Sequence, residues 1–121
     1  MADEVFKLIN LSGHPIEQEG VCCVAGYGPV NVDLADPVAL KATAVEMALL
    51  IVAHQGENEL IPVALPGMVP LATHVLAAAH GLMGQFPSIA WASRNASGKF
   101  VWRAEQSTDL QAWRTELRIS R

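Results

Sequence analysis

The sequence predicts a single α/β domain over residues 1–121, with a small Rossmann-like fold. Three observations favour this fold. Apolar, β-rich segments alternate with longer helical segments, short turns join them, and the last two β segments have the pattern of a hairpin. We therefore expect a mainly parallel sheet that ends in a C-terminal β-hairpin, with helices on both faces.

The first strand is expected at Val5–Leu11, which is apolar except for Lys7 and Asn10, as in a strand that is covered on both faces. A second apolar strand is expected at Val21–Ala25. The link between them, Ile16–Gly20, is too short for a crossover helix, although parallel neighbours usually need about a dozen connecting residues.

The first helix is expected to begin with Asp36 as its N-cap and Pro37 in its first turn, and to end near His54. One apolar stripe runs along it: Val38, Ala42, Val45, Leu49 and Val52. Further apolar residues surround most of its circumference. We therefore expect this helix to be buried on two sides, against the sheet and against a second subunit.

A central strand is expected at Ile61–Leu65, followed by a turn at Pro66–Gly67 and a helix from Val69 to about Gln85. The buried stripe of this helix is expected to consist of Ala72, Val75, Leu76 and Ala79. A strand that runs directly into a helix N-terminus is how open α/β sheets build anion sites.

The C-terminal hairpin is expected to pair Ser88–Arg94 with Lys99–Gln106 across a tight turn at Asn95–Gly98. Thr108 and Gln111 have the spacing of a capping box for a last helix. The apolar residues of that helix are expected to face inward and its arginines outward: Leu110, Trp113 and Leu117 against Arg114, Arg118 and Arg121.

Composition indicates an oligomeric protein. Hydrophobic residues make up 51% of the chain and charged residues 17%, which favours a homo-oligomer, in the first place a two-fold dimer. Cys22 and Cys23 are adjacent in an apolar run, so we expect two small buried hydrophobes and no disulfide. The acidic start lacks the basic region of a secretory signal, and the most apolar helix is too short to span a bilayer. We expect a cytoplasmic protein without a membrane partner.

Charge is distributed unevenly. Residues 1–60 hold nine acidic and two basic side chains, and residues 61–121 hold three acidic and six basic ones, so −7 stands against +3 and the net charge is −4. A broad basic face for duplex DNA is therefore not expected. Arg94, Lys99 and Arg103 on the hairpin could reach a small anion, or could be a solvated edge that discourages sheet aggregation.

The end of the first strand is one half of the candidate site. Ligands of open α/β sheets bind at the carboxyl ends of the parallel strands, where this strand delivers Asn10, Ser12, Gly13 and His14. A histidine in that position can donate or accept a proton near neutral pH. As ordinary turn residues, these side chains would instead hydrogen-bond their own loop.

The end of the central strand is the other half of the candidate site. Pro66, Gly67 and Met68 precede a helix whose first N–H groups have no partner inside the helix, and such groups bind anions. His74 and His80 are six residues apart, so they do not share a helix face as ligands at i and i+4 would, and no HExxH motif is present. We therefore expect neither a metal site nor a cofactor. A dinucleotide fingerprint, a P-loop and a GxSxG elbow are also absent from the sequence.

Three segments resemble a known family: NLSGHP at Asn10–Pro15, LPG at Leu65–Gly67 and HGLMGQFP at His80–Pro87. Together they are similar to the small stand-alone accessory proteins of type III CRISPR systems, the Csx series, in particular its member fifteen. The likeness is strongest from Leu60 to Ile89. The chain departs from that group in having almost no first helix between His14 and Val21.

The resemblance implies a CARF-like Rossmann fold and a homodimer that recognises cyclic oligoadenylate second messengers, chiefly cyclic tetra-adenylate. It carries two sets of residues to the ligand: Asn10, Ser12, Gly13 and His14 on a first loop, and Pro66 and Gly67 on a phosphate-facing second loop. Some related proteins are ring nucleases that cut the messenger and switch off the antiviral response.

If this chain cleaves the ring, the expected route is metal-independent and leaves a 2',3'-cyclic phosphate end. Charge stabilisation is then assigned to Ser12 and to the backbone at Gly67 and Met68, and proton transfer to His14. Two alternatives stay open. A non-enzymatic binder would sequester the messenger, with higher-order assembly around it, and a dimeric α/β module unrelated to nucleotides would bind none of it.

Overall fold

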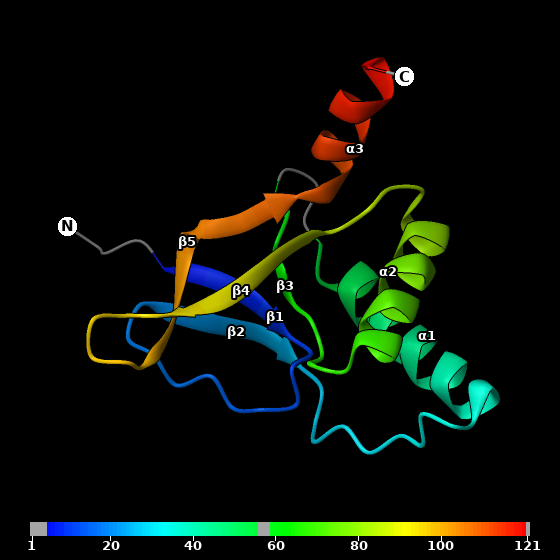
Figure 1. Ribbon diagram of the computed structural model, residues 1–121, viewed down its shortest axis with the longest axis horizontal. Coiled ribbons are helices and arrows are strands. Elements are labelled where there is room, and N and C mark those ends of the chain that lie inside the picture. Colours follow the sequence, from blue (N-terminus) through cyan, green and yellow to red (C-terminus); the bar gives the residue numbers. More distant parts are fainter. Residues whose placement is uncertain (1–4, 56–58, 121) are drawn as a thin grey trace.

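The structure is a computed structural model that describes residues 5–55 and 59–120 (Figure 1). Along these residues the elements are β1 (Phe6–Asn10), β2 (Val21–Gly26), α1 (Pro37–Ala53), β3 (Val63–Ala64), α2 (Val69–Met83), β4 (Ser88–Arg94), β5 (Phe100–Asp109) and α3 (Leu110–Ile119). No helix within the described part of the chain has the length and apolar character that a membrane crossing requires.

The strands form one five-stranded sheet in the order β2-β1-β3-β4-β5. The pairs β2–β1, β1–β3 and β3–β4 are parallel, and β5 pairs antiparallel with β4. The expected α/β class, the mainly parallel sheet and the C-terminal hairpin are therefore confirmed. β1 lies inside the sheet, and Leu8 and Ile9 at its centre are fully buried.

Residues 11–20 join β1 to its parallel neighbour β2 without a helix. The link turns at Gly13 and Gly20, whose φ angles of 82° lie in the left-handed region that glycine adopts without strain. A strand of five residues is about 17 Å long, and an extended link of this length can retrace it. The short connection is therefore compatible with parallel pairing.

The expectation of helices on both faces is wrong. α1 and α2 pack against each other on one face of the sheet (Figure 1), where their buried residues share a core with β1 and β3. The strand order explains this, because β2 to β3 and β3 to β4 advance in the same direction across the sheet. Right-handed crossovers that advance in one direction place their helices on the same face.

The other face of the sheet is also covered at its centre. Ile9 belongs to the core beneath the helices, so Leu8, its neighbour on β1, points to the opposite face and is still fully buried. The pairing of β4 with β5 shifts between Ala90 and Ala92, and β5 is tied to the link before β2 by the side chain of Gln18.

The N-terminus of α1 is as expected: the Asp36 side chain accepts hydrogen bonds from the backbone N–H groups of Val38 and Ala39, both at 3.1 Å. The helix buries Leu40, Ala44, Met47, Ala48 and Ile51 instead of the stripe noted in the sequence. That stripe is exposed. α2 buries Leu71, Val75 and Ala79 and ends at Met83, where Gly84 caps it in the left-handed conformation.

The expected capping box of the last helix is wrong. β5 continues to Asp109, which pairs with Ser88, so Thr108 lies inside the strand. Asp109 is the N-cap, and its side chain accepts from the backbone N–H of Ala112 at 3.1 Å. Gln111 instead accepts a hydrogen bond from the backbone N–H of Phe86 at 2.9 Å.

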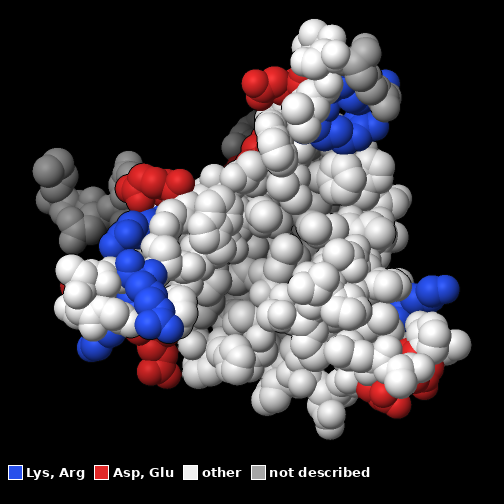
Figure 2. All heavy atoms as spheres, in the orientation of Figure 1, with Lys and Arg blue, Asp and Glu red and all other residues white. Residues whose placement is uncertain are grey.

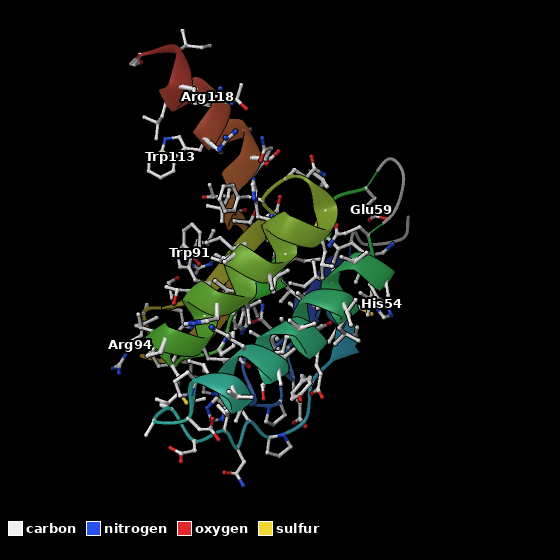
Figure 3. All side chains as sticks on the ribbon, turned by 90° about the vertical axis from the view of Figure 1, so that its right-hand side faces the viewer. His54, Glu59, Trp91, Arg94, Trp113 and Arg118 are labelled. Carbon is white, nitrogen blue, oxygen red and sulfur yellow. The ribbon has the colours of Figure 1, made fainter. Side chains whose placement is uncertain are left out.

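The inward orientation expected for the apolar residues of α3 is also wrong. α3 projects away from the sheet (Figures 1 and 3) and buries no residue, with Trp113 and Leu117 more than half exposed. Trp113 and Leu117 belong to the lining of an open groove of about 380 Å³. The groove is lined by five apolar residues and two arginines: Leu76, Phe86, Leu110, Trp113, Leu117, Arg114 and Arg118. Arg121 lies outside the described residues.

Cys22 and Cys23 are free and exposed, so the expectation of two buried hydrophobes is wrong. They lie on β2, which is one of the two edge strands of the sheet. An edge strand has a neighbour on one side only, which leaves its early residues open to solvent.

Candidate functional site

Asn10 organises the loop that follows β1. Its side chain is 9% exposed, its Nδ2 donates to the His14 carbonyl oxygen at 2.8 Å, and its Oδ1 accepts from the Ser12 backbone N–H at 3.0 Å. Oδ1 also accepts from the Ser12 hydroxyl at 2.6 Å. The Asn10 amide thus holds the loop in shape and is directed into it.

Ser12 is engaged in the same network. Its hydroxyl carries one hydrogen, and the short distance to Asn10 Oδ1 shows where that hydrogen goes. The His14 backbone N–H donates to the Ser12 Oγ at 3.2 Å. The hydroxyl therefore presents a remaining lone pair, an acceptor, to its surroundings.

Gly13 brings this loop against the segment that precedes α1. A Cβ at Gly13 would lie 3.1 Å from Val30 Cγ2 and 3.3 Å from the Val30 backbone nitrogen. Since the φ angle of Gly13 is also positive, glycine satisfies both the local conformation and the close packing.

The second loop lies at the N-terminus of α2. Met68 is the N-cap residue and makes no capping hydrogen bond with its side chain, and Pro70 occupies the first turn. The first N–H groups of such a helix have no intrahelical acceptor and attract negative charge. Pro66 is buried and supports the turn from behind, whereas Gly67 is exposed.

The two loops meet in a depression of about 320 Å³. Its lining consists of Ser12, Gly13, His14, Pro29, Val30, Gly67 and Met68. The structure thus brings together five of the predicted site residues, while Asn10 and Pro66 are buried behind them. Pro29 and Val30, which precede α1, were not predicted as site residues.

A second depression, of about 480 Å³, lies on the other side of His14. It is lined by His14, Pro15, Ile16, Glu17, Gln18, Phe100 and Trp102. The guanidinium carbon of Arg94 lies 4.9 Å from the centroid of the Phe100 ring, so the hairpin offers two aromatic rings and a cation beside the loop.

Sequence reasoning missed Phe100 and Trp102 as site residues. They line the same depression as His14, and Gln18 bonds the backbone of Trp102, a partner 84 positions away in the sequence. No local motif reports such a contact. An aromatic pattern on a strand by itself predicts only half-buried sheet residues.

His14 is the residue that the two depressions share. Its side chain is exposed, and its imidazole has no hydrogen-bond partner among the residues the structure describes. The ring is therefore available to an external group. It could donate to a phosphate oxygen or exchange a proton with a hydroxyl.

The other histidines have local roles. His54 Nδ1 lies 2.9 Å from the Leu50 carbonyl oxygen, and His74 Nδ1 lies 2.6 Å from that of Pro70. His80 stacks against Phe86, with ring centroids 4.3 Å apart. Within residues 5–55 and 59–120, no three His, Cys, Asp or Glu side chains gather in a way that could hold a metal ion.

The electrostatics of the site depend on the backbone. Among the residues that the structure describes, no lysine or arginine lines either depression, and Glu17 is the one charged side chain that does. On the face that Figure 2 shows, charged residues lie at the margins of the molecule and the middle is uncharged. An anion in the first depression would therefore be held by N–H groups and by His14.

Comparisons with known proteins found no match: no protein-family model, no curated protein and no solved structure is significantly similar to this chain.

Proposed function

We propose that this protein is a cytoplasmic homodimer that binds a cyclic oligoadenylate, in the first place cyclic tetra-adenylate, and thereby lowers antiviral signalling. The observation that carries the proposal is the position of His14 between two depressions of different character. One has backbone N–H groups of a loop and a helix N-terminus, and the other has aromatic rings. A nucleotide has one part for each depression: a phosphate, which N–H groups bind, and a base, which stacks on aromatic rings.

The chemistry of the two depressions matches the parts of the ligand. A phosphate fits the first, where the turn at Gly67 and the α2 N-terminus supply donors without net positive charge. An adenine fits the second, where stacking on Trp102 or Phe100 would contribute about 1–3 kcal/mol. Cyclic tetra-adenylate contains a two-fold axis, so a two-fold dimer can offer it the same site twice.

Metal-independent cleavage is the second candidate function, favoured by the exposed imidazole of His14. In this reaction a ribose 2'-hydroxyl attacks the adjacent phosphorus, the bond to the 5'-oxygen breaks, and a 2',3'-cyclic phosphate and a 5'-hydroxyl form. His14 would take the proton of the 2'-hydroxyl or give one to the 5'-oxygen, which typically contributes about 10²- to 10⁴-fold. Without cleavage, the protein lowers signalling by sequestering the ring.

The test is incubation of the purified protein, in excess over radiolabelled cyclic tetra-adenylate, with EDTA. Retention is read on a native gel and products on a denaturing gel. The proposal expects retention. Linear products with a cyclic phosphate end identify a ring nuclease, and an intact retained ring identifies a sequestering binder.

Two variants assign the result to the site. His14→Ala should abolish any cleavage and weaken retention, because it removes the group between the two depressions. His74→Ala is the matched control, since that imidazole bonds its own helix. Absence of retention by the wild-type protein would refute the proposed function, including both of its forms.

A further inference from the structure

α1 has two apolar sides, and the core covers only one. The exposed side carries Val38, Ala42, Val45, Leu49 and Val52, which we call the α1 seam. Val38 is 78% exposed and Leu49 is 52% exposed. The residues that α1 buries lie on the other side of the helix, so the seam faces away from the core.

The spacing of the seam is that of a coiled coil. Its members follow one another at intervals of four, three, four and three residues, which is the alternation of heptad positions d and a. A surface helix that only covers a core has no reason to repeat this pattern on its solvent side. The pattern indicates packing against a second helix, and α1 is already folded in the domain, so helix formation adds no further cost.

The charges beside the seam identify the partner. Lys41 and Glu46 are the only charged residues inside α1, and both are exposed. In the heptad that the seam defines, Lys41 occupies position g and Glu46 the following position e. In a parallel pair of identical helices, g of one helix faces the following e of the other, so Lys41 meets Glu46 of a second copy twice.

Glu46 is held in place for this contact. The Tyr27 hydroxyl donates to its Oε2 at 2.6 Å, and Oε1 has no partner among the described residues. Lys41 makes no ion pair within that part of the chain. An antiparallel arrangement would instead bring position e against e and g against g, and would not join these two residues.

We propose that the α1 seam is the interface between two copies of this chain, paired in parallel about a two-fold axis along α1. The pairing has a consequence that rests on the proposed function. α1 begins at Pro37, after the segment that leaves the carboxyl end of β2 and includes Pro29 and Val30 of the first depression. A parallel pair therefore places the first depressions of the two copies at the same end of the dimer, whereas an antiparallel pair would place them at opposite ends.

Charge reversal tests the pairing without any ligand. Lys41→Glu and Glu46→Lys should each raise the dimer dissociation constant, measured by sedimentation equilibrium, by about 10-fold or more, because each places like charges together twice. An equimolar mixture of the two variants, and the double variant Lys41→Glu/Glu46→Lys, should dimerise like the wild type. Rescue in neither sample would overturn the parallel pairing, and a wild-type protein that stays monomeric would overturn the interface.

A matched pair of leucines tests the surface itself. Leu49→Glu should raise the dissociation constant by at least about 100-fold, because it buries a charge within the seam. Leu117→Glu changes a leucine on α3 with the same exposed fraction, 52%, and should leave dimerisation unchanged. The opposite ranking would place the interface on α3. Circular dichroism of both variants confirms that each is folded.

Cross-linking tests whether the two α1 helices pair in parallel. In a background of Cys22→Ser and Cys23→Ser, Val38→Cys should form a disulfide between two copies, because a parallel seam brings identical positions together. Ser97→Cys, in the exposed turn between β4 and β5, is the control and should not. No disulfide in the first variant would contradict the parallel direction. Failure of these tests would leave ligand binding by a single chain standing.

Discussion

Gln18 and Trp102 form two hydrogen bonds that join the link between β1 and β2 to the last strand of the sheet. The Gln18 side chain donates from Nε2 to the Trp102 carbonyl oxygen at 2.9 Å, and its Oε1 accepts from the Trp102 backbone N–H at 2.8 Å. Trp102 pairs with Ala92 of β4, and the Gln18 side chain adds a second partner to its backbone. It also places the aromatic rings of β5 beside His14.

Removing this contact should separate the hairpin from the loop. Gln18→Ala leaves the Trp102 N–H and carbonyl without their partner, and we expect a loss of about 1–2 kcal/mol in the free energy of unfolding, measured with urea. Glu17→Ala, at the exposed neighbouring position, should cost less than about 0.5 kcal/mol. Equal losses in the two variants would show that the contact does not stabilise the fold.

A comparison of two glycines in the β1–β2 link distinguishes the cost of backbone strain from the cost of a packing clash. Gly13 and Gly20 share a φ of 82°, so alanine at either position should cost about 1–2 kcal/mol for its left-handed conformation. A Cβ at Gly13 also meets Val30 at 3.1 Å, whereas a Cβ at Gly20 meets no atom within 4 Å. Gly13→Ala should therefore destabilise the fold by about 1 kcal/mol more than Gly20→Ala. Identical unfolding free energies would contradict this packing.

The Tyr27–Glu46 contact predicts a dependence on high pH. The hydrogen bond to Glu46 raises the pKa of Tyr27 above its ordinary value of 10.0, with smaller contributions from burial and from the nearby carboxylate charge. Because the pKa is higher in the folded state, the stabilisation is present below pH 10 and is lost as the pH rises through the folded-state value.

Tyr27→Phe measures this effect. The wild type should be more stable than the variant at neutral pH, and the difference should shrink as the pH rises above 10, in denaturant titrations at several pH values. A difference that stays constant or grows over that range would contradict a neutral phenol that donates to Glu46.

Ligand binding should depend little on salt. The described residues that line the two depressions include no lysine or arginine, so few counterions are exchanged when phosphates bind. The dissociation constant of cyclic tetra-adenylate should change less than about threefold between about 50 and about 200 mM NaCl. A change of more than about tenfold would show that cations outside the depressions, such as those of the hairpin, hold the phosphates.

Local signals made much of the fold predictable. Asp36 with Pro37 marked the start of α1, and the turn at Asn95–Gly98 marked the hairpin, because caps and turns depend on a few adjacent residues. The face on which each helix lies was not predictable in this way. Both sides of α1 are apolar, so the local pattern does not show which side faces the core, and the face of the sheet on which α1 lies depends on the strand order.

The candidate site was predictable to a similar degree. The carboxyl-edge rule brought Ser12, Gly13 and His14 together with Gly67 and Met68, as the structure shows. The rule does not say which side chains make their hydrogen bonds within the loop, as Asn10 does. Nor does it reveal Trp102, whose position depends on a long-range contact through Gln18.

Isothermal titration of the wild-type protein with cyclic tetra-adenylate addresses the proposed function directly. The site geometry and the two-fold pairing predict saturable binding with one ring for every two chains, and a much weaker signal for His14→Ala. Absence of binding heat up to about 100 µM ligand, a concentration that would detect complexes of about −6 kcal/mol or stronger, would contradict the proposal that these loops recognise a cyclic nucleotide.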